Sequence, residues 1–433
     1  MLANFLFSFA LGLMTLENLS RDIFVLSVSE DEDSLGSLLL VNIIFRHGDR
    51  SPVSSYPTDP YNNVSYWPAG WGQLTNAGKQ QQYELGQWLR KRYSKFLPEM
   101  YNREDIFVRS TDVDRTLMSA ESNLAGLYPP RQWQKWSANI SWQPIPIHTV
   151  PENMDQVLAG ERPCPRYNAE MERVKSSPEM KRFNEEHAEL YKYISEKSGA
   201  VVHDPESLEY IYNTLFIEDL YNLTLPNWTK EVYPDKMKPV ASFSFTVPAK
   251  TKLLQRLKIG PLMGEMVKHM IEKRDGVLRP NYKMFMYSGH DVTIANFLMA
   301  LGVFDPQSPP YRALIMVELW KTKQGKHKVM VYFRNSTAHE PYNLIIPGCQ
   351  AACPLDDFAR LLKPVIPFNW EKECKKGLFS DDFAFNSLAI IALMVSGILA
   401  VLLLLSMVFG ITYWKKQRMS SNYYYHRLHQ DVS

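Results

Sequence analysis

The sequence lacks several features that mark common classes of protein. Its 433 residues include four cysteines and carry a net charge of only +2. No CxxC pair, basic run or glycine-rich phosphate loop occurs, and the nearly balanced charge gives no reason to expect nucleic-acid binding. The histidines show neither HxH nor HExxH spacing, so we expect no metal site and no cofactor.

The composition is that of a globular protein, with 45% hydrophobic and 22% charged residues. The length allows one large domain or two ordinary ones. The 28 prolines and 10 tryptophans favour a loop-rich, well-packed protein over a helical bundle.

A long apolar run lies near the C-terminus. Residues 383–414 contain no charged residue and exceed the roughly 20 apolar residues that span a bilayer. A buried core helix is the alternative, but Asp381 and Asp382 precede the run and the basic KKQR follows it. This charge bias predicts a transmembrane helix over 384–414 and a cytosolic tail at 415–433.

The N-terminus is also apolar. Residues 1–16 have the length of a signal-peptide core, although no basic residue opens them. We predict a signal peptide within 1–29, without a defined cleavage site. With the transmembrane helix, it indicates a single-pass type I membrane protein whose main domain, residues 37–380, is luminal or extracellular.

The cysteines and glycosylation sequons agree with this location. All four cysteines precede the transmembrane segment, and an even number in an oxidising compartment suggests two disulfides. Asn-x-Ser/Thr sequons, the candidate glycosylation sites, occur at Asn63, Asn139, Asn222, Asn227 and Asn335.

Hydrophobic patterns predict strands and helices that alternate along the chain. The predicted strands cover 37–45, 105–111, 282–291, 313–320 and 327–335. The predicted helices cover 74–93, 114–128, 260–276 and 291–302. Such alternation favours an α/β sheet, with an antiparallel pair joined by a turn at Gly325. Charged residues at helical spacing predict a helical subdomain over about 152–245.

Three predicted strands end in, or lead into, unusual polar side chains. They are Arg46, His47 and Arg50, then Arg115, then His290 and Asp291. In an open α/β sheet, ligands bind outside the carboxyl ends of the strands, so these residues can meet at one point. The three arginines and two histidines would repel one another unless an anion joined them.

Phosphate is the anion that suits this set of side chains. Arginine binds phosphate oxygens bidentately and stays charged. A histidine nitrogen can attack phosphorus, and a carboxylic acid can protonate the leaving alkoxide. Taken singly, each part has a simpler interpretation: a surface Arg-His pair, helix capping by Asp112 and Asp114, or a turn at 290–291.

These stretches resemble the signatures of the histidine acid phosphatases, the second branch of the histidine phosphatase superfamily. RHGDRSP at 46–52 matches the RHGxRxP signature, and SGHD at 288–291 matches the second motif. Residues 67–75, 109–120 and 142–151 also look like the prostatic and lysosomal members. The resemblance extends over about residues 39–375.

The resemblance implies a phosphoglycerate-mutase-like α/β core with an inserted, mainly helical cap at about 152–245. It implies that His47 is the nucleophile that forms a phosphohistidine and that Asp291 is the proton donor to the leaving group. The phosphate clamp would be Arg46, Arg50, Arg115 and His290. No metal is implied, because the arginines take the place of a cation, and the expected substrates are phosphate monoesters.

The sequence departs from these relatives in two respects. Gly289 stands before the histidine of the second motif, where relatives often have alanine; a small residue is retained. Relatives commonly have six luminal cysteines, and here Ile217 and Ile315 occupy the positions of one pair, which fits the loss of one whole bridge. The remaining match implies the disulfides Cys164–Cys374 and Cys349–Cys353.

The tail adds a candidate sorting signal. Tyr425 to Leu428, YHRL, resembles a tyrosine-based internalisation signal that sorting adaptors bind, although such tetrads also occur by chance. With the span and the catalytic domain, it favours a lysosomal or endosomal location over the cell surface. The family resemblance also suggests a homodimer.

Two rival functions are also compatible with the sequence. The first is a relative with a narrower substrate, such as a phytase or a lysophosphatidic acid phosphatase. The second is a non-catalytic surface receptor that kept the fold, which the intact set of six site residues argues against.

Overall fold

The structure is a computed structural model that describes residues 36–375 and the helix over 383–430. The chain divides into one unit that ends at Lys375 and a second that begins at Lys376. The predicted signal peptide lies outside the described residues.

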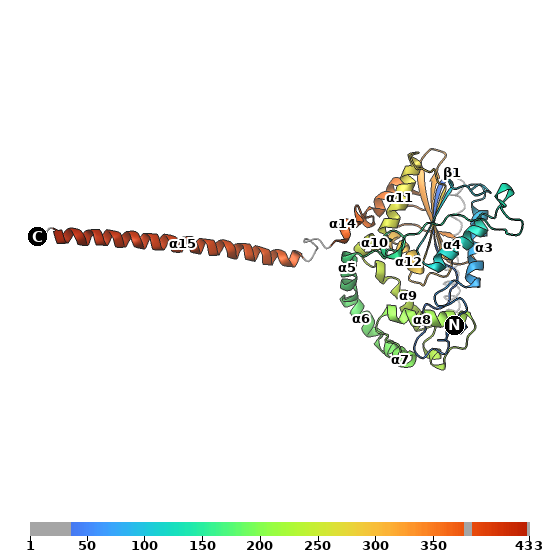
Figure 1. Ribbon diagram of the computed structural model, residues 1–433, viewed down its shortest axis with the longest axis horizontal. Coiled ribbons are helices and arrows are strands. Elements are labelled where there is room, and N and C mark those ends of the chain that lie inside the picture. Colours follow the sequence, from blue (N-terminus) through green and yellow to red (C-terminus); the bar gives the residue numbers. More distant parts are fainter. Residues whose placement is uncertain (1–35, 376–382, 431–433) are drawn as a thin grey trace, which may run out of the picture. The chain divides into compact units, whose positions relative to one another are not determined.

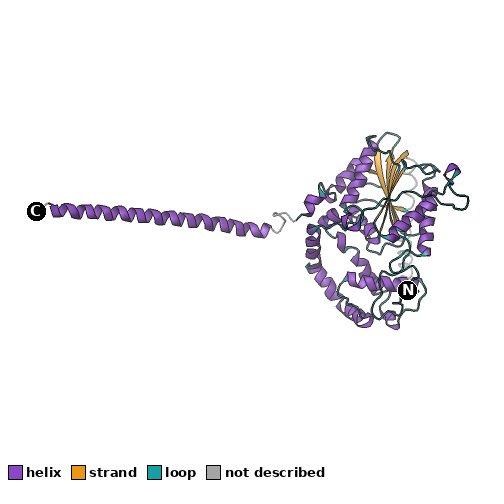
Figure 2. Ribbon diagram, in the orientation of Figure 1, coloured by secondary structure: helices purple, strands orange, loops and turns teal. Residues whose placement is uncertain are grey.

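A mixed β-sheet forms the centre of the first unit (Figures 1 and 2). Its strands are β1 (Ser37–Arg46), β2 (Ile106–Ser110), β3 (Met284–Gly289), β4 (Leu314–Lys321), β5 (His327–Arg334), β6 (Tyr342–Asn343) and β7 (Cys353–Pro354). The order is β2-β3-β1-β4-β5-β6, and β7 also pairs with β5. Strands β1, β2 and β3 are parallel, whereas β4 and β5 run antiparallel, which confirms the predicted α/β sheet.

Strand β1 is buried on both faces. Leu40 and Ile44 pack into the core on one face, and Ile43 and Phe45 pack into the core on the other. The first face is covered by α11 (Gly260–Arg274), α12 (Asp291–Leu301) and α13 (Leu355–Leu362), and the second by α3 (Asn76–Arg92) and α4 (Asp114–Leu127). Because both faces are covered, the strand reads as a continuous apolar run.

From Pro165 onward the segment before α11 is mainly helical, as the sequence predicts for about 152–245. Its helices are α5 (Pro165–Lys175), α6 (Pro178–Glu186), α7 (Ala188–Ser198), α8 (Pro205–Leu220), α9 (Met237–Ser244) and α10 (Lys252–Lys258). In Figure 1, α5, α6 and α7 follow one another along an arc, with α8 and α9 inside it. Ile194, Leu208 and Met237 belong to a core of this segment that is separate from the two cores of the sheet.

Short helices complete the first unit. They are η1 (Val64–Tyr66), η2 (Gln132–Gln134), η3 (Glu152–Met154), η4 (Asn227–Glu231), η5 (Val247–Ala249), η6 (Lys363–Val365) and α14 (Trp370–Cys374).

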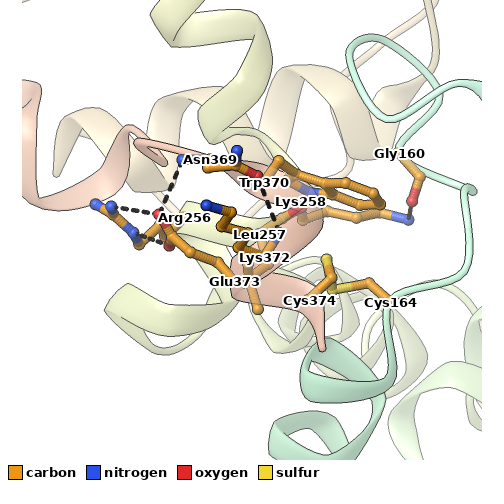
Figure 3. The surroundings of a disulfide bond; sticks show 10 residues. All are labelled: Gly160, Cys164, Arg256, Leu257, Lys258, Asn369, Trp370, Lys372, Glu373 and Cys374. Atoms are coloured by element: carbon orange, nitrogen blue, oxygen red, sulfur yellow. Dashed lines mark hydrogen bonds and ion pairs between the residues drawn. A yellow bond between two sulfur atoms is a disulfide. The ribbon is translucent and has the colours of Figure 1, made fainter. Parts of the chain in front are cut away.

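The C-terminal end of the first unit is fastened to α5 and α10 (Figure 3). Cys374 forms a disulfide with Cys164, just before α5. Glu373 accepts two bonds from Arg256, at 2.5 and 2.9 Å, and Trp370 donates to a carbonyl oxygen of α10 at 2.8 Å. The second disulfide joins Cys349 and Cys353, so both pairings are those that the resemblance implied.

The second unit contains the helix α15 (Phe383–Gln430). Its segment Ile391–Met419 contains an 18-residue window with a mean hydropathy of 2.8 and is long and apolar enough to cross a membrane. The prediction of one apolar C-terminal helix is therefore confirmed. The side chains of the tail tetrad at 425–428 lie outside the described part of this helix.

Candidate active site

Backbone contacts bring the ends of β1 and β3 together. Gln82 of α3 donates from Nε2 to the carbonyl oxygen of Arg46 at 2.8 Å. The N–H of His47 donates to the carbonyl oxygen of Gly289, the last residue of β3, at 3.0 Å. The two signature segments, more than 200 residues apart in the chain, therefore meet at one edge of the sheet.

Gly48 is required because the loop after β1 packs closely on α3. A Cβ at Gly48 would lie 2.3 Å from the carbonyl oxygen of Gly78, closer than two such atoms can approach. The N–H of Gly48 also donates to Ser119 Oγ of α4 at 3.1 Å. The glycine of the RHG signature thus lets the loop lie between the starts of two helices.

His47 is held in one tautomer and kept neutral. It is 1% exposed, and its Nδ1 lies 2.8 Å from the carbonyl oxygen of Gly48, so Nδ1 carries the proton and donates it. The lone pair is then on Nε2. Burial, followed by the charge of Arg46, holds the pKa of His47 well below its usual value. The imidazole therefore stays neutral in acid, as a nucleophile must.

A chain of hydrogen bonds orients the second histidine. Arg115 donates to Nδ1 of His290 at 3.4 Å, so the ring proton lies on Nε2, which donates to Thr111 Oγ1 at 3.0 Å. Burial, followed by Arg115, lowers the pKa of His290 to about 3. The ring centroids of His47 and His290 are 5.7 Å apart. In this arrangement neutral His290 orients the Arg115 guanidinium beside the nucleophile.

Arg46 joins the nucleophile loop to the second motif. Its Nη2 lies 2.7 Å from Oδ2 of Asp291, and its Nη1 donates to the carbonyl oxygen of Pro309. The guanidinium carbon lies 4.4 Å from the centroid of the Tyr311 ring. These contacts fix a buried arginine with its charge next to His47.

The protonation of Asp291 depends on the charges around it. Burial would raise its pKa, but Arg46 and then Arg50 outweigh burial and hold the pKa of Asp291 below its usual value. The carboxyl is therefore ionised in the free protein at mildly acidic pH. An anion that takes up the charge of the two arginines would raise this pKa again.

A cavity of about 660 Å³, a size typical of ligand sites, adjoins the cluster. Arg50 and Asp291 line it from the sheet side, and Glu209 and Asn213 line it from α8. Arg50 donates from Nη2 to Asn213 Oδ1 at 2.9 Å. Burial, followed by Asp291, raises the pKa of Glu209 to about 7, so this carboxyl is protonated in acid.

The structure brings all six sequence-predicted site residues to one place. Four of them act electrostatically on the fifth, His47, and lower its pKa: Arg46, His290, Arg115 and Arg50. Asp291 is ion-paired to Arg46. Three guanidiniums against one ion-paired carboxylate leave an excess of positive charge, which an anion such as phosphate would neutralise.

Three further residues complete the site and carry no signal in the sequence: Tyr311, Asn213 and Glu209. Tyr311 lies in a loop after α12, and the other two lie on a helix whose charged residues resemble a solvated face. None belongs to a motif. Contacts with Arg46 and Arg50 reveal Tyr311 and Asn213, and the lining of the cavity reveals Glu209.

Among the residues that the structure describes, no group of three or more His, Cys, Asp or Glu side chains could hold a metal ion. The cations at the site are the arginines themselves.

A family comparison agrees with this geometry. Residues 37–335, more than half of the chain, match the model of the histidine phosphatase superfamily (branch 2). The chain belongs to this superfamily. The branch 2 assignment confirms the resemblance that the two signature motifs indicate.

The similar curated proteins are acid phosphatases. The chain is 42% identical to lysosomal acid phosphatase of Xenopus laevis over 375 residues, covering 85% of this chain and 86% of that protein. It is 43% identical to prostatic acid phosphatase of Homo sapiens over 343 residues, covering 78% and 88%. Identity to human lysosomal acid phosphatase is 39% over 380 residues, covering 86% and 88%.

Solved structures share the fold at lower identity. Hafnia alvei phytase in complex with tartrate has a TM-score of 0.61 and 18% identity, covering 79% of this chain and 99% of that chain. The phytase from Citrobacter braakii has a TM-score of 0.58, also at 18% identity, covering 79% and 100%. At this identity the likeness establishes the histidine phosphatase fold alone.

The departures from the relatives take on a structural meaning. A Cβ at Gly289 would lie 2.9 Å from Thr293 Oγ1, the atom that accepts the N–H of His290 at 3.2 Å. Alanine there would push on the turn that carries the second motif. Ile217 and Ile315 are fully buried, as apolar replacements of a cysteine pair would be.

The predicted glycosylation sites differ in exposure. Asn63, Asn139, Asn222 and Asn227 are exposed, whereas Asn335 is half-buried. Glycosylation of all five stays a prediction.

Proposed function

We infer that this protein is an acid phosphatase that hydrolyses phosphate monoesters through a covalent phosphohistidine. The observation that carries the mechanism is a buried, neutral His47 whose Nε2 lone pair lies among the guanidiniums of Arg46, Arg50 and Arg115. An imidazole in water is largely protonated at about pH 5, since its pKa is about 6.5. Here burial, together with the surrounding positive charge, lowers the pKa of His47 and keeps the nucleophile available in acid.

In the first step, Nε2 of His47 attacks phosphorus and the P–O bond to the leaving group breaks. The arginines neutralise the charge on the phosphoryl oxygens, as cations do in other phosphoryl-transfer sites. His290 contributes by orienting Arg115. The bond electrons leave with the ester oxygen, which requires a proton if the leaving group is an alkoxide.

Asp291 supplies that proton. Its pKa is low while it faces Arg46 and Arg50 alone, but a bound phosphate shares their charge and raises the pKa. Substrate binding therefore favours the protonated form of Asp291. In the second step, the Asp291 carboxylate takes a proton from water, water attacks the phosphohistidine, and inorganic phosphate leaves as His47 recovers its lone pair.

We also propose that the protein is a type I membrane protein of lysosomes or endosomes. The apolar helix Ile391–Met419 and the similarity to lysosomal acid phosphatases support a lysosomal membrane location. The cytosolic tail, adaptor binding at 425–428 and a homodimer rest on the sequence and the family resemblance. The limits of the cap domain at about 152–245 are proposed on the same grounds.

The test of the mechanism is to trap the intermediate. The protein is mixed with a phosphate monoester labelled with ³²P in the phosphoryl group, quenched, and digested for mapping. Label should appear on the peptide that contains His47 and be stable in base but lost in acid. His47→Ala should remove both the label and several orders of magnitude of the rate, because the nucleophile is lost outright.

If His47→Ala turns over at the wild-type rate, water attacks phosphorus directly, and the assignment of His47 as the nucleophile is wrong. A panel of alkyl phosphates, lysophosphatidic acid and inositol hexakisphosphate separates a general acid phosphatase from a narrower one. A folded protein with no turnover on any of them would favour the receptor alternative.

A further inference from the structure

A second cavity adjoins the cluster of site residues, and the charge of its lining differs from that of the first cavity. It measures about 510 Å³, and Arg46 and Tyr311 connect it to the site. Its other cations are Lys238, Arg312 and Arg334, and none of the residues described as lining it is acidic. The cavity beside Asp291, by contrast, is lined by several carboxylates, including that of Glu209.

Arg334 is the most unusual residue of this second cavity. It ends β5, is 8% exposed, and has its guanidinium carbon 4.7 Å from the centroid of the Trp88 ring. Its buried Nε has no hydrogen-bond partner, and no ion pair of Arg334 occurs within the described part of the chain. Leaving a buried guanidinium without a counter-charge is costly, so the position favours an anionic ligand.

Arg312 is a second cation beside Arg334, and it is itself ion-paired outside the cavity lining, with its Nη1 2.9 Å from Oε2 of the exposed Glu84. Burial, followed by Arg312, lowers the pKa of Arg334, and only the exposed Glu340 opposes this effect among the charges that act on it. Arg312 adopts the left-handed conformation at φ 57°, which few residues other than glycine adopt. Its N–H donates to the carbonyl oxygen of His47 at 3.1 Å. The arginine is thus tied to the nucleophile loop.

Sheet register places the two parts of the cavity close together. Phe45 of β1 pairs with Leu314 of β4, which pairs with Arg334 of β5. Two inter-strand spacings amount to about 10 Å. A small anion at Arg334 therefore lies near enough to influence Arg46, the next residue along β1.

We propose that this cavity is a second anion-binding site, which takes a small oxyanion or a carboxylate beside the phosphate that is hydrolysed. It rests on the proposed function. Its cavity is distinct from that of Asp291, with which it shares Asn213 among the described lining residues. The anion is either free in solution or carried by the substrate. A free anion bound there shares the positive charge of the Arg46 guanidinium. Less of that charge then stabilises the phosphoryl group, so the anion should lower kcat.

The experiment uses sulfate as the free anion and p-nitrophenyl phosphate as the substrate, at constant ionic strength set with chloride. Because Asn335 also lines the cavity, the full chain is produced in cells that glycosylate. Sulfate should compete with substrate at the catalytic site and, separately, lower kcat through the second site. The inhibition constant for the kcat effect measures the second site alone.

Two variants and one matched control test the assignment. Lys238→Gln should weaken the kcat effect of sulfate by about threefold, since Lys238 is an exposed partner. Arg334→Gln should weaken it by about tenfold or more, since a buried charged hydrogen bond is lost. Lys236→Gln removes an exposed lysine outside the cavity lining and should leave the effect unchanged.

A second arm identifies an anion carried by the substrate. Phenyl phosphate is compared with its carboxylated derivatives. If the substrate supplies the anion, kcat/KM for the carboxylated substrate relative to phenyl phosphate should fall in Lys238→Gln but not in Lys236→Gln. A response in either arm supports the site and names its source. If neither arm responds while p-nitrophenyl phosphate is still hydrolysed, the second site is wrong. If the wild type hydrolyses none of the substrates, the proposed function is wrong instead.

Discussion

At the scale of single residues, the site works through the charge state of each side chain. Arg46 and Arg50 lower the pKa of both reacting groups, which leaves the histidine neutral and the carboxyl ionised until substrate arrives. One set of charges therefore supports activity in acid and makes proton donation depend on bound phosphate.

Asp291→Asn should separate leaving groups by their need for a proton. Alkyl phosphates leave as alkoxides, whereas p-nitrophenyl phosphate leaves as a stabilised phenolate. We expect kcat/KM for glycerol phosphate to fall by about 10² to 10⁴ at about pH 5, and far less for p-nitrophenyl phosphate. Equal losses on both substrates would mean that Asp291 only positions Arg46.

The same residue predicts the shape of the pH profiles. In the wild type, kcat reports the acid in the substrate complex, and kcat/KM reports the free protein. Because bound phosphate raises the pKa of Asp291, kcat should decline at higher pH than kcat/KM on glycerol phosphate. Asp291→Asn should lose this separation.

At the scale of elements, α8 and the loop after β1 bring two buried carboxyl groups close together. Glu218 of α8 is 0% exposed and lies beside Asp59, which is 3% exposed and accepts from Ser55 Oγ at 2.9 Å. Burial, followed by Asp59, raises the pKa of Glu218 to about 9. The folded protein therefore holds a proton that the unfolded chain releases above its ordinary pKa of about 4.5.

This proton makes stability depend on pH in a defined direction. Between the unfolded and folded pKa values of Glu218, the native state binds more protons than the unfolded chain. The free energy of unfolding is therefore highest in acid. It falls as pH rises through this range, by at most about 1.4 kcal/mol per pH unit. Glu218→Gln should flatten this fall. Urea unfolding at several pH values measures it, with the exposed Glu186→Gln as control. Parallel curves for wild type and Glu218→Gln would mean that another group holds the proton.

The two disulfides should contribute unequally. Cys164–Cys374 closes a separation of 210 residues, and Cys349–Cys353 closes one of 4. Loop-closure entropy then gives about 5 kcal/mol for the first and about 2 kcal/mol for the second. Double serine variants of each pair, compared by the urea midpoint of activity, should follow this order. Equal midpoints would show that the contacts of Arg256 and Trp370 already hold the C-terminal segment.

At the scale of the whole molecule, the sequence predicts what local patterns and motifs encode. The strands of the sheet follow from their apolar runs, and the six site residues follow from strand ends and two signatures. Contacts such as Arg50 to Asn213 join residues 163 apart and leave no local trace. The two-residue strands β6 and β7 are too short for any period to show. Arg334 reads as the polar end of a strand, and only the cavity makes it a candidate ligand site.

The catalytic unit should work without its apolar helix. Every site residue and all four cysteines precede Lys375, where the first unit ends, and Cys374, Glu373 and Trp370 fasten that end to the helices around it. A secreted fragment of residues 37–380 should therefore be soluble, with kcat/KM within about twofold of the full chain in detergent, because every site residue lies in the first unit.

A shorter fragment that ends at residue 368 is the control. It keeps the six site residues but loses Cys374, Glu373 and Trp370, so it leaves Cys164 unpaired and Arg256 without its carboxylate. We expect it to be secreted poorly or to lose activity at lower urea concentration than the 37–380 fragment. If the 37–380 fragment folds but is inactive while the full chain is active, the catalytic unit depends on the apolar helix, and the division of the chain into a self-sufficient enzyme and an anchor is wrong.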